Sequence, residues 1–106
     1  MSWIIVIFYR TQGLATVTEI GSMSVTCSPS SSQTTYTSAT GTYTFKESYT
    51  NVPTCAYYIA ISHNYLRFVS VTGCSVTKTG ISITVTSHYN SSNLGLSFII
   101  YVMSND

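Results

Sequence analysis

Charged side chains are scarce in this sequence: only 7% of its 106 residues are Asp, Glu, Lys or Arg, against about 25% in typical soluble domains. The acids are Glu19, Glu47 and Asp106. A glycosidase needs two carboxylates across a cleft, and a phosphoryl-transfer enzyme needs carboxylates to hold its metal. The shortage of acids therefore argues against both classes. Glu19 and Glu47 are expected to lie singly on the solvent face of strands, and a pair in space is the alternative.

Basic residues are also few, at four against three acids, and the formal net charge is only +1. Arg10, Lys46, Arg67 and Lys78 are scattered along the chain, whereas binding to a phosphate backbone needs many convergent cations. We therefore expect no nucleic-acid partner. So little charge also gives little protection against self-association. The composition predicts an apolar surface that is covered by copies of this chain or by a larger assembly.

The cysteines and histidines show no pattern of a known site. Cys27, Cys55 and Cys74 are odd in number and form no C-x-x-C, which favours free thiols in a protein made in a reducing cytosol. One disulfide with a spare thiol is the alternative. His63 and His88 could join a thiol in a Cys–His dyad or a metal site, but no spacing supports either. We expect no cofactor, no metal and no enzymatic activity.

Long hydrophobic runs are absent as well. The apolar stretch near the start of the sequence covers only residues 3–9, which is too short to span a membrane. It also lacks the basic flank and the small-residue cleavage site of a secretory signal. We interpret it as a β-strand that is apolar on both faces, and we expect no membrane insertion.

Helical periodicity is missing, whereas alternation with a period of two is common. In the stretch SVTKTGISITVTS, Ile81, Ile83 and Val85 fall on one face and Ser82 and Thr84 on the other, as in a half-buried strand. Short strands separated by turn residues favour one antiparallel β-sandwich or barrel spanning residues 1–106. The predicted strands cover residues 3–9, 14–20, 22–27, 41–48, 54–62, 67–72, 74–78, 81–87 and 94–103.

Two predicted strands, residues 3–9 and 96–103, are apolar on both faces. A strand of this kind must be covered twice, once by its own core and once by another surface. We therefore predict a subunit interface on these strands, and the alternative is that both lie centrally under loops of the same chain. The interface residues are predicted to be Trp3, Ile5, Ile7, Phe98, Ile100 and Val102.

Two predicted turns carry aromatic rings beside imidazole and amide groups. Tyr, Asn and Ser make rigid or adaptable contacts in binding loops at low entropic cost, and a sugar needs both a ring for its C–H face and partners for its hydroxyls. The alternative is that Asn and Ser simply favour turns. The predicted glycan contacts are His63, Asn64, Tyr65, Arg67, His88, Tyr89 and Asn90.

Residues 40–103 resemble a known family. Tyr43-Thr-Phe45 followed by Tyr49-Thr-Asn-Val-Pro53, the hairpin Val76–Val85 and the closing strand Leu96–Val102 are similar to H-type lectin domains and to the C-terminal domains of bacteriophage tail fibres. The resemblance implies an H-type lectin-like antiparallel β-sandwich, usually a homotrimer that recognises surface glycans. The closing strand departs from the family's Trp-Ile-Ala-Ile-Gly, residues 1–35 have no counterpart, and no sugar ligand is carried over.

From these features we predict a non-enzymatic structural or receptor-binding subunit of a bacteriophage particle. It would be a tail-fibre or spike tip, or a capsid-attached fibre or decoration protein, made in the host cytoplasm and working in the virion. Its expected partners are copies of itself, other virion proteins and host cell-surface glycans. Residues 1–35 would be an assembly or anchoring segment, and residues 40–103 the lectin-like core. A free-standing soluble lectin is the alternative.

Overall fold

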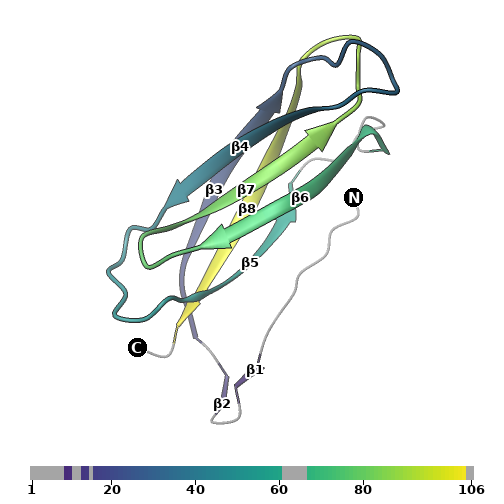
Figure 1. Ribbon diagram of the computed structural model, residues 1–106. Helices are drawn as coiled ribbons and strands as arrows, with labels where there is room; N and C mark the ends of the chain where they lie inside the picture. Colours follow the sequence, from purple (N-terminus) through teal and green to yellow (C-terminus); the bar gives the residue numbers. More distant parts are fainter. Residues whose placement is uncertain (1–8, 11–12, 15, 61–66, 105–106) are drawn as a thin grey trace.

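The computed structural model describes residues 9–10, 13–14, 16–60 and 67–104, with side chains from residue 16 onward. These residues form two three-stranded antiparallel sheets and a small two-stranded ribbon, with no α-helix (Figure 1). None of them forms a helix long and apolar enough to cross a membrane.

The first sheet has the order β3 (Thr16–Cys27), β8 (Leu94–Ser104), β5 (Thr54–Ile59). The second has the order β4 (Thr37–Thr44), β7 (Gly80–Ser87), β6 (Val69–Val76). The ribbon pairs β1 (Tyr9–Arg10) with β2 (Gly13–Leu14).

The predicted all-β antiparallel architecture is confirmed, but several strand boundaries differ. Residues 14–20 and 22–27, predicted as separate strands, lie largely in the single strand β3. Residues 67–72 and 74–78 likewise give one strand, β6, with a register shift between Val71 and Gly73. Glycine inside a strand marks a bulge or a close backbone approach as readily as a turn. The sequence pattern alone could not separate these cases.

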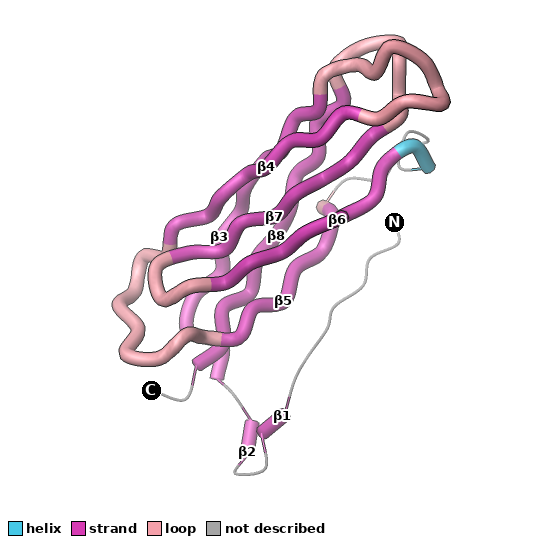
Figure 2. Tube along the Cα trace, viewed as in Figure 1, coloured by secondary structure: helices cyan, strands magenta, loops and turns pink. Residues whose placement is uncertain are grey.

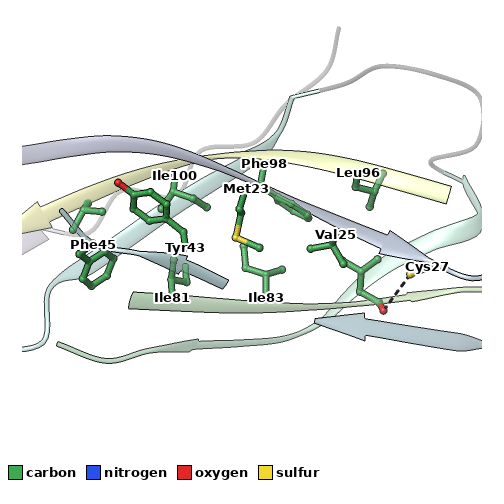
Figure 3. Packing of buried hydrophobic residues seen from close by; sticks show 12 residues of the cluster. Met23, Val25, Cys27, Tyr43, Phe45, Ile81, Ile83, Leu96, Phe98 and Ile100 are labelled. Carbon is green, nitrogen blue, oxygen red and sulfur yellow. Dashed lines mark hydrogen bonds between the residues drawn. The ribbon is translucent and has the colours of Figure 1, made fainter. Parts of the chain in front are cut away.

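The core lies between the two sheets, where alternate residues of each strand meet (Figure 3). The central strands β7 and β8 contribute the most deeply buried side chains, as expected for strands with a neighbour on each side. Cys27 belongs to the same layer, and its thiol donates to the Val85 carbonyl at 3.7 Å. The fully enclosed side chains, all 0% exposed, are Ile83, Val85, Phe98, Ile100 and Val102, together with Ser87.

The predicted interface on the last strand is wrong. Phe98, Ile100 and Val102 are buried in the core of their own chain, so they are not available to a second subunit. β8 pairs with β3 on one side and β5 on the other, and this pairing turns the three residues towards the second sheet. The other predicted interface residues, Trp3, Ile5 and Ile7, lie outside the described residues.

The outer face of the second sheet consists of hydroxyl groups. Hydrogen bonds between neighbouring strands join Ser38 to Thr86 at 2.9 Å and Thr40 to Thr84 at 2.8 Å. The same ladder continues from Thr42 to Ser82 at 3.0 Å. Cross-strand hydroxyl pairs of this kind stabilise a sheet modestly. The ladder accounts for the Ser and Thr residues at alternate positions along β4 and β7.

The outer face of the first sheet is apolar in its central part. Ile20 on β3 is 56% exposed, and its neighbours Ile99 and Tyr101 on β8 are half-buried. The ring of Tyr101 lies 6.2 Å from that of Tyr58 on β5, measured between centroids. We call Ile20, Tyr58, Ile99 and Tyr101 the outer apolar face. Contiguous exposed apolar groups of this kind are typical of interaction surfaces.

Glu19 was predicted to lie singly on the solvent face of a strand, and this prediction is also wrong, because the side chain is half-buried and hydrogen-bonded to its neighbours. Its carboxylate accepts hydrogen bonds from the hydroxyls of Tyr43 and of Tyr49, the latter at 2.9 Å. It also accepts from the backbone N–H groups of Lys46 at 3.0 Å and Glu47 at 3.0 Å. The side chain therefore fastens β3 to the end of β4 and to the connection that follows it. We call this arrangement the Glu19 clamp.

Gly21 is required for the packing of an aromatic ring. A Cβ atom at Gly21 would lie 2.1 Å from Cζ of Tyr43, far inside van der Waals contact, so Tyr43 would have to move. We expect Gly21→Ala to lower the free energy of unfolding by about 1–2 kcal/mol, as overpacking does. The control is Gly95→Ala, where the nearest atom would lie 3.5 Å away. Equal melting temperatures of both variants and the wild type would contradict the expected clash.

Candidate binding site at the loop end

Two connections and the start of β6 meet at one end of the sandwich, which we call the loop end. The register pairs Cys27 with Leu94, and both Thr37 and Val69 with Ser87. The connection of residues 28–36, the connection of residues 88–93 and the start of β6 therefore lie at the same end (Figure 2). Loops carried by a rigid scaffold are a frequent place for binding residues.

An aromatic cluster covers part of this end, and it consists of Tyr36, Arg67, Phe68, His88 and Tyr89. The ring of Tyr36 stacks on His88, with centroids 5.3 Å apart and planes 5° from parallel. Phe68 meets the rings of His88 and Tyr89 at 5.2 Å each. The guanidinium carbon of Arg67 lies 4.8 Å from the centroid of Phe68, within cation–π range. We call these five residues the loop-end cluster.

Hydrogen bonds fix the connection of residues 28–36 to that of residues 88–93. The side chain of Ser30 is buried, and its hydroxyl lies 2.6 Å from the Ser32 carbonyl and 3.1 Å from the His88 carbonyl. The Ser30 N–H donates to the Tyr89 carbonyl at 2.9 Å. The His88 N–H donates to the Phe68 carbonyl at 3.0 Å. The connection of residues 28–36, which is rich in serine, is thus anchored through the buried Ser30.

The orientation of His88 leaves one ring nitrogen for a ligand. Nδ1 lies 3.2 Å from the backbone carbonyl of Gln33. Because a carbonyl oxygen only accepts, Nδ1 carries the hydrogen in this contact. A neutral imidazole then keeps Nε2 as an acceptor. Stacking against Tyr36 holds the ring in place, so the acceptor has a fixed direction.

The loop-end cluster offers the contacts that a sugar requires. Most of the Tyr36 side chain is exposed, at 63%, so a ring is available for the C–H face of a pyranose. Arg67 and Asn90 are also exposed and can donate to hydroxyls. The described acids, Glu19 and Glu47, lie at the opposite end, beside the start of β5. The charge of Arg67 would therefore favour sugars that carry a carboxylate or a sulfate.

The structure brings part of the predicted site together. Arg67, His88 and Tyr89 meet in the loop-end cluster, and Asn90 belongs to the same connection. His63, Asn64 and Tyr65 lie outside the described residues. Sequence reasoning missed two members of the cluster, Tyr36 and Phe68. The only signal for Tyr36 was its position as the single aromatic residue in a polar loop.

The described residues show no metal-binding cluster. Nowhere in residues 16–60 and 67–104 do three His, Cys, Asp or Glu side chains gather in one place. The described contacts of the His88 ring are with Gln33, Tyr36 and Phe68, none of which supplies a thiol or a carboxylate. The three cysteines are free thiols: Cys27 is buried, Cys55 half-buried and Cys74 exposed.

Comparison with known proteins found no match to this chain among family models, curated proteins or solved structures.

Proposed function

We propose that this chain is a non-enzymatic β-sandwich subunit of a bacteriophage particle, and that its loop end contacts glycans on the host surface. The observation that carries the proposal is the loop-end cluster. A stacked, largely exposed tyrosine, a fixed imidazole acceptor and a cation lie on loops held by a rigid sandwich. The resemblance of residues 40–103 to H-type lectins and tail-fibre domains supports the same assignment.

The outer apolar face supports the proposed assembly into a homotrimer within the virion. We propose this face in place of the interface predicted on Phe98, Ile100 and Val102, because Ile20, Ile99 and Tyr101 are partly exposed apolar residues of the same strand pair. A chain with 7% charged residues has little means of keeping such a face soluble. Symmetry-related copies would cover it.

Binding is tested by changing the loop-end cluster. We expect Tyr36→Ala and His88→Ala each to reduce binding to host cells or to a glycan array at least tenfold, with the melting temperature changed little for Tyr36→Ala. The reason is that Tyr36 is mostly exposed, so its ring contributes to contact with a ligand more than to the core. Binding is measured on the purified protein by flow cytometry of host cells and on the array.

The control is Val52→Ala, an exposed residue at the opposite end of the sandwich, which should leave binding unchanged. Unaltered binding after the double change Tyr36→Ala and His88→Ala would refute the site. A chain that is absent from purified virions, yet binds glycans through the loop-end cluster, would favour the free-standing lectin.

A further inference from the structure

The charged side chains of the sandwich are unevenly distributed between its two ends. Glu19, Lys46 and Glu47 all belong to the Glu19 clamp. Lys78 lies in the turn between β6 and β7, at the same end as the clamp. Both places lie at the far end of the sandwich from the loop end (Figure 1). Among the charged side chains that the structure describes, only Arg67 therefore lies at the loop end.

The described acids are too far from Arg67 to neutralise its charge. Strand β7 joins the two ends and has 8 residues, which corresponds to a length of about 25 Å. Exposed charges are screened over about 8 Å at physiological ionic strength, so Glu19 and Glu47 contribute little to the potential around Arg67. Asp106, the remaining acid of the sequence, lies outside the described residues. The described part of the loop end therefore carries a positive charge with no acid beside it.

The guanidinium of Arg67 is exposed and held in place by an aromatic ring. Its central carbon lies 4.8 Å from the centroid of Phe68, and the charge is attracted to the face of the ring. The ring offers no oxygen acceptor to the five N–H groups, whose planar fork matches the two oxygens of a carboxylate. Hydrogen bonds to such an anion are about twice as strong as those between neutral groups. Arg67 therefore suits an anionic ligand better than a neutral hydroxyl.

A chain of ring contacts separates Arg67 from the exposed ring of Tyr36. Tyr36 stacks on His88 at 5.3 Å, and His88 meets Phe68, which carries Arg67, at 5.2 Å. Two rings therefore lie between the tyrosine that would take the C–H face of a sugar and the cation that would take an anion. Nε2 of His88 lies in the same chain of contacts and can accept from a sugar hydroxyl. A ligand that uses all three groups needs more than one sugar residue.

We propose that the loop end selects anionic oligosaccharides, in which one sugar residue stacks on Tyr36 and a neighbouring one places its carboxylate or sulfate on Arg67. This inference rests on the proposed binding of glycans and names the class of glycan. A neutral sugar of the same shape would give the guanidinium only hydroxyl partners, so we expect the anionic form to bind about tenfold more tightly. Nucleic acids are not expected as ligands, because one cation cannot neutralise many phosphates.

Paired oligosaccharides test the charge preference. The purified full-length chain is titrated onto an array printed in pairs that differ in one residue: glucuronate against glucose, and sulfated against unsulfated galactose. Among the pairs that bind, we expect the anionic member to bind about tenfold more tightly. The preference should shrink as the NaCl concentration rises, because salt screens exposed charges. A preference for glucuronate alone would identify the anion as a carboxylate, and one for sulfated galactose alone would identify a sulfate ester. Either result supports the proposal.

Substitutions of Arg67 test whether this residue supplies the preference. Arg67→Gln should lower the affinity for the anionic member to that for the neutral one, whereas the neutral member should bind as it does to the wild type. Arg67→Lys keeps the charge but loses the planar fork, so part of the preference should remain. The control is Lys78→Gln, which removes the same charge from an exposed side chain at the opposite end and should leave the preference unchanged. Melting temperatures of the three variants show whether the fold persists.

Four outcomes would overturn the proposal. Equal affinity of the wild type for both members of every bound pair would refute the charge selection but leave glycan binding intact. An equal loss of both members in Arg67→Gln would mean that Arg67 holds the loop end in shape. A lost preference in Lys78→Gln would assign the effect to the net charge of the whole chain. If the wild type binds no member of the array and no host cell, the proposed function fails together with this inference.

Discussion

Phe98→Ala is expected to lower the free energy of unfolding by about 3–5 kcal/mol, the usual cost of removing a buried phenylalanine. Phe98 is 0% exposed between the two sheets, and the Tyr57 ring packs against it at 5.7 Å. Truncation would leave a cavity that rigid strands on both sides cannot close. Because a domain of this size is stabilised by only about 5–15 kcal/mol, much of the stability would be lost. Urea denaturation followed by circular dichroism measures the effect.

The matched control is the next residue, Ile99→Ala, on the opposite face of β8. Ile99 is half-buried in the outer apolar face, so we expect a loss of only about 1 kcal/mol. Self-association should be weakened more by Ile99→Ala than by Phe98→Ala, because Ile99 and not Phe98 faces the proposed partner copies. A Phe98→Ala variant that keeps its stability but dissociates into monomers would restore the interface that the structure contradicts.

The sequence pattern predicted that β8 is a strand but assigned its two faces the wrong way round: Phe98, Ile100 and Val102 lie in the core, and Ile99 and Tyr101 face outward. Alternation predicts a strand reliably when one face is polar, as in β7, where Ile83 and Val85 alternate with Ser82 and Thr84. In β8 both faces are apolar, so the period of two leaves two equivalent choices. The pairing with β3 resolves them, since Met23 and Val25 lie opposite Phe98 and Leu96. That pairing joins residues far apart in the sequence.

The sequence predicted some residues of the loop-end cluster, but it did not predict which other residues would pack against them. Arg67, His88 and Tyr89 were identified because turns with aromatic, imidazole and amide groups suit recognition. Tyr36 and Phe68 join them only because two connections and the start of β6 meet at one end of the sandwich. Stacking partners separated by about fifty residues leave no local pattern. The Glu19 clamp could not be predicted for the same reason, because its donors lie on β4 and on the β4–β5 connection, more than twenty residues from Glu19 in the sequence.

Glu19→Gln is expected to lower the free energy of unfolding by about 2 kcal/mol at pH 7. A hydrogen bond to a charged group contributes about 1.5–3 kcal/mol, and the carboxylate accepts from two tyrosine hydroxyls and two backbone N–H groups. Because Glu19 is partly exposed to water, the four hydrogen bonds together contribute less free energy than the sum of their separate values. A neutral amide keeps the shape of the side chain but offers one acceptor oxygen instead of two, so some of these donors lose their partner.

The same clamp predicts how stability depends on pH. Desolvation raises the pKa of Glu19, but the hydrogen bonds from Lys46, Tyr43, Glu47 and Tyr49 outweigh it and lower the pKa from 4.5 to about 2. Because the folded-state pKa lies below the unfolded one, the contribution is fully present above pH 4.5. It is lost as the pH falls towards 2. The advantage of the wild type over Glu19→Gln should therefore be constant from pH 7 to 5 and shrink by pH 2.5.

Glu47→Gln is the control, because it removes the same chemical group from an exposed side chain in the same connection. It should leave stability at pH 7 within about 0.5 kcal/mol of the wild type. The backbone N–H of residue 47 still donates to Glu19 in this variant, so the clamp persists. Equal losses in both variants would mean that general charge effects, rather than the clamp, stabilise this end of the sandwich. A wild-type advantage that stays constant down to pH 2.5 would contradict the lowered pKa of Glu19.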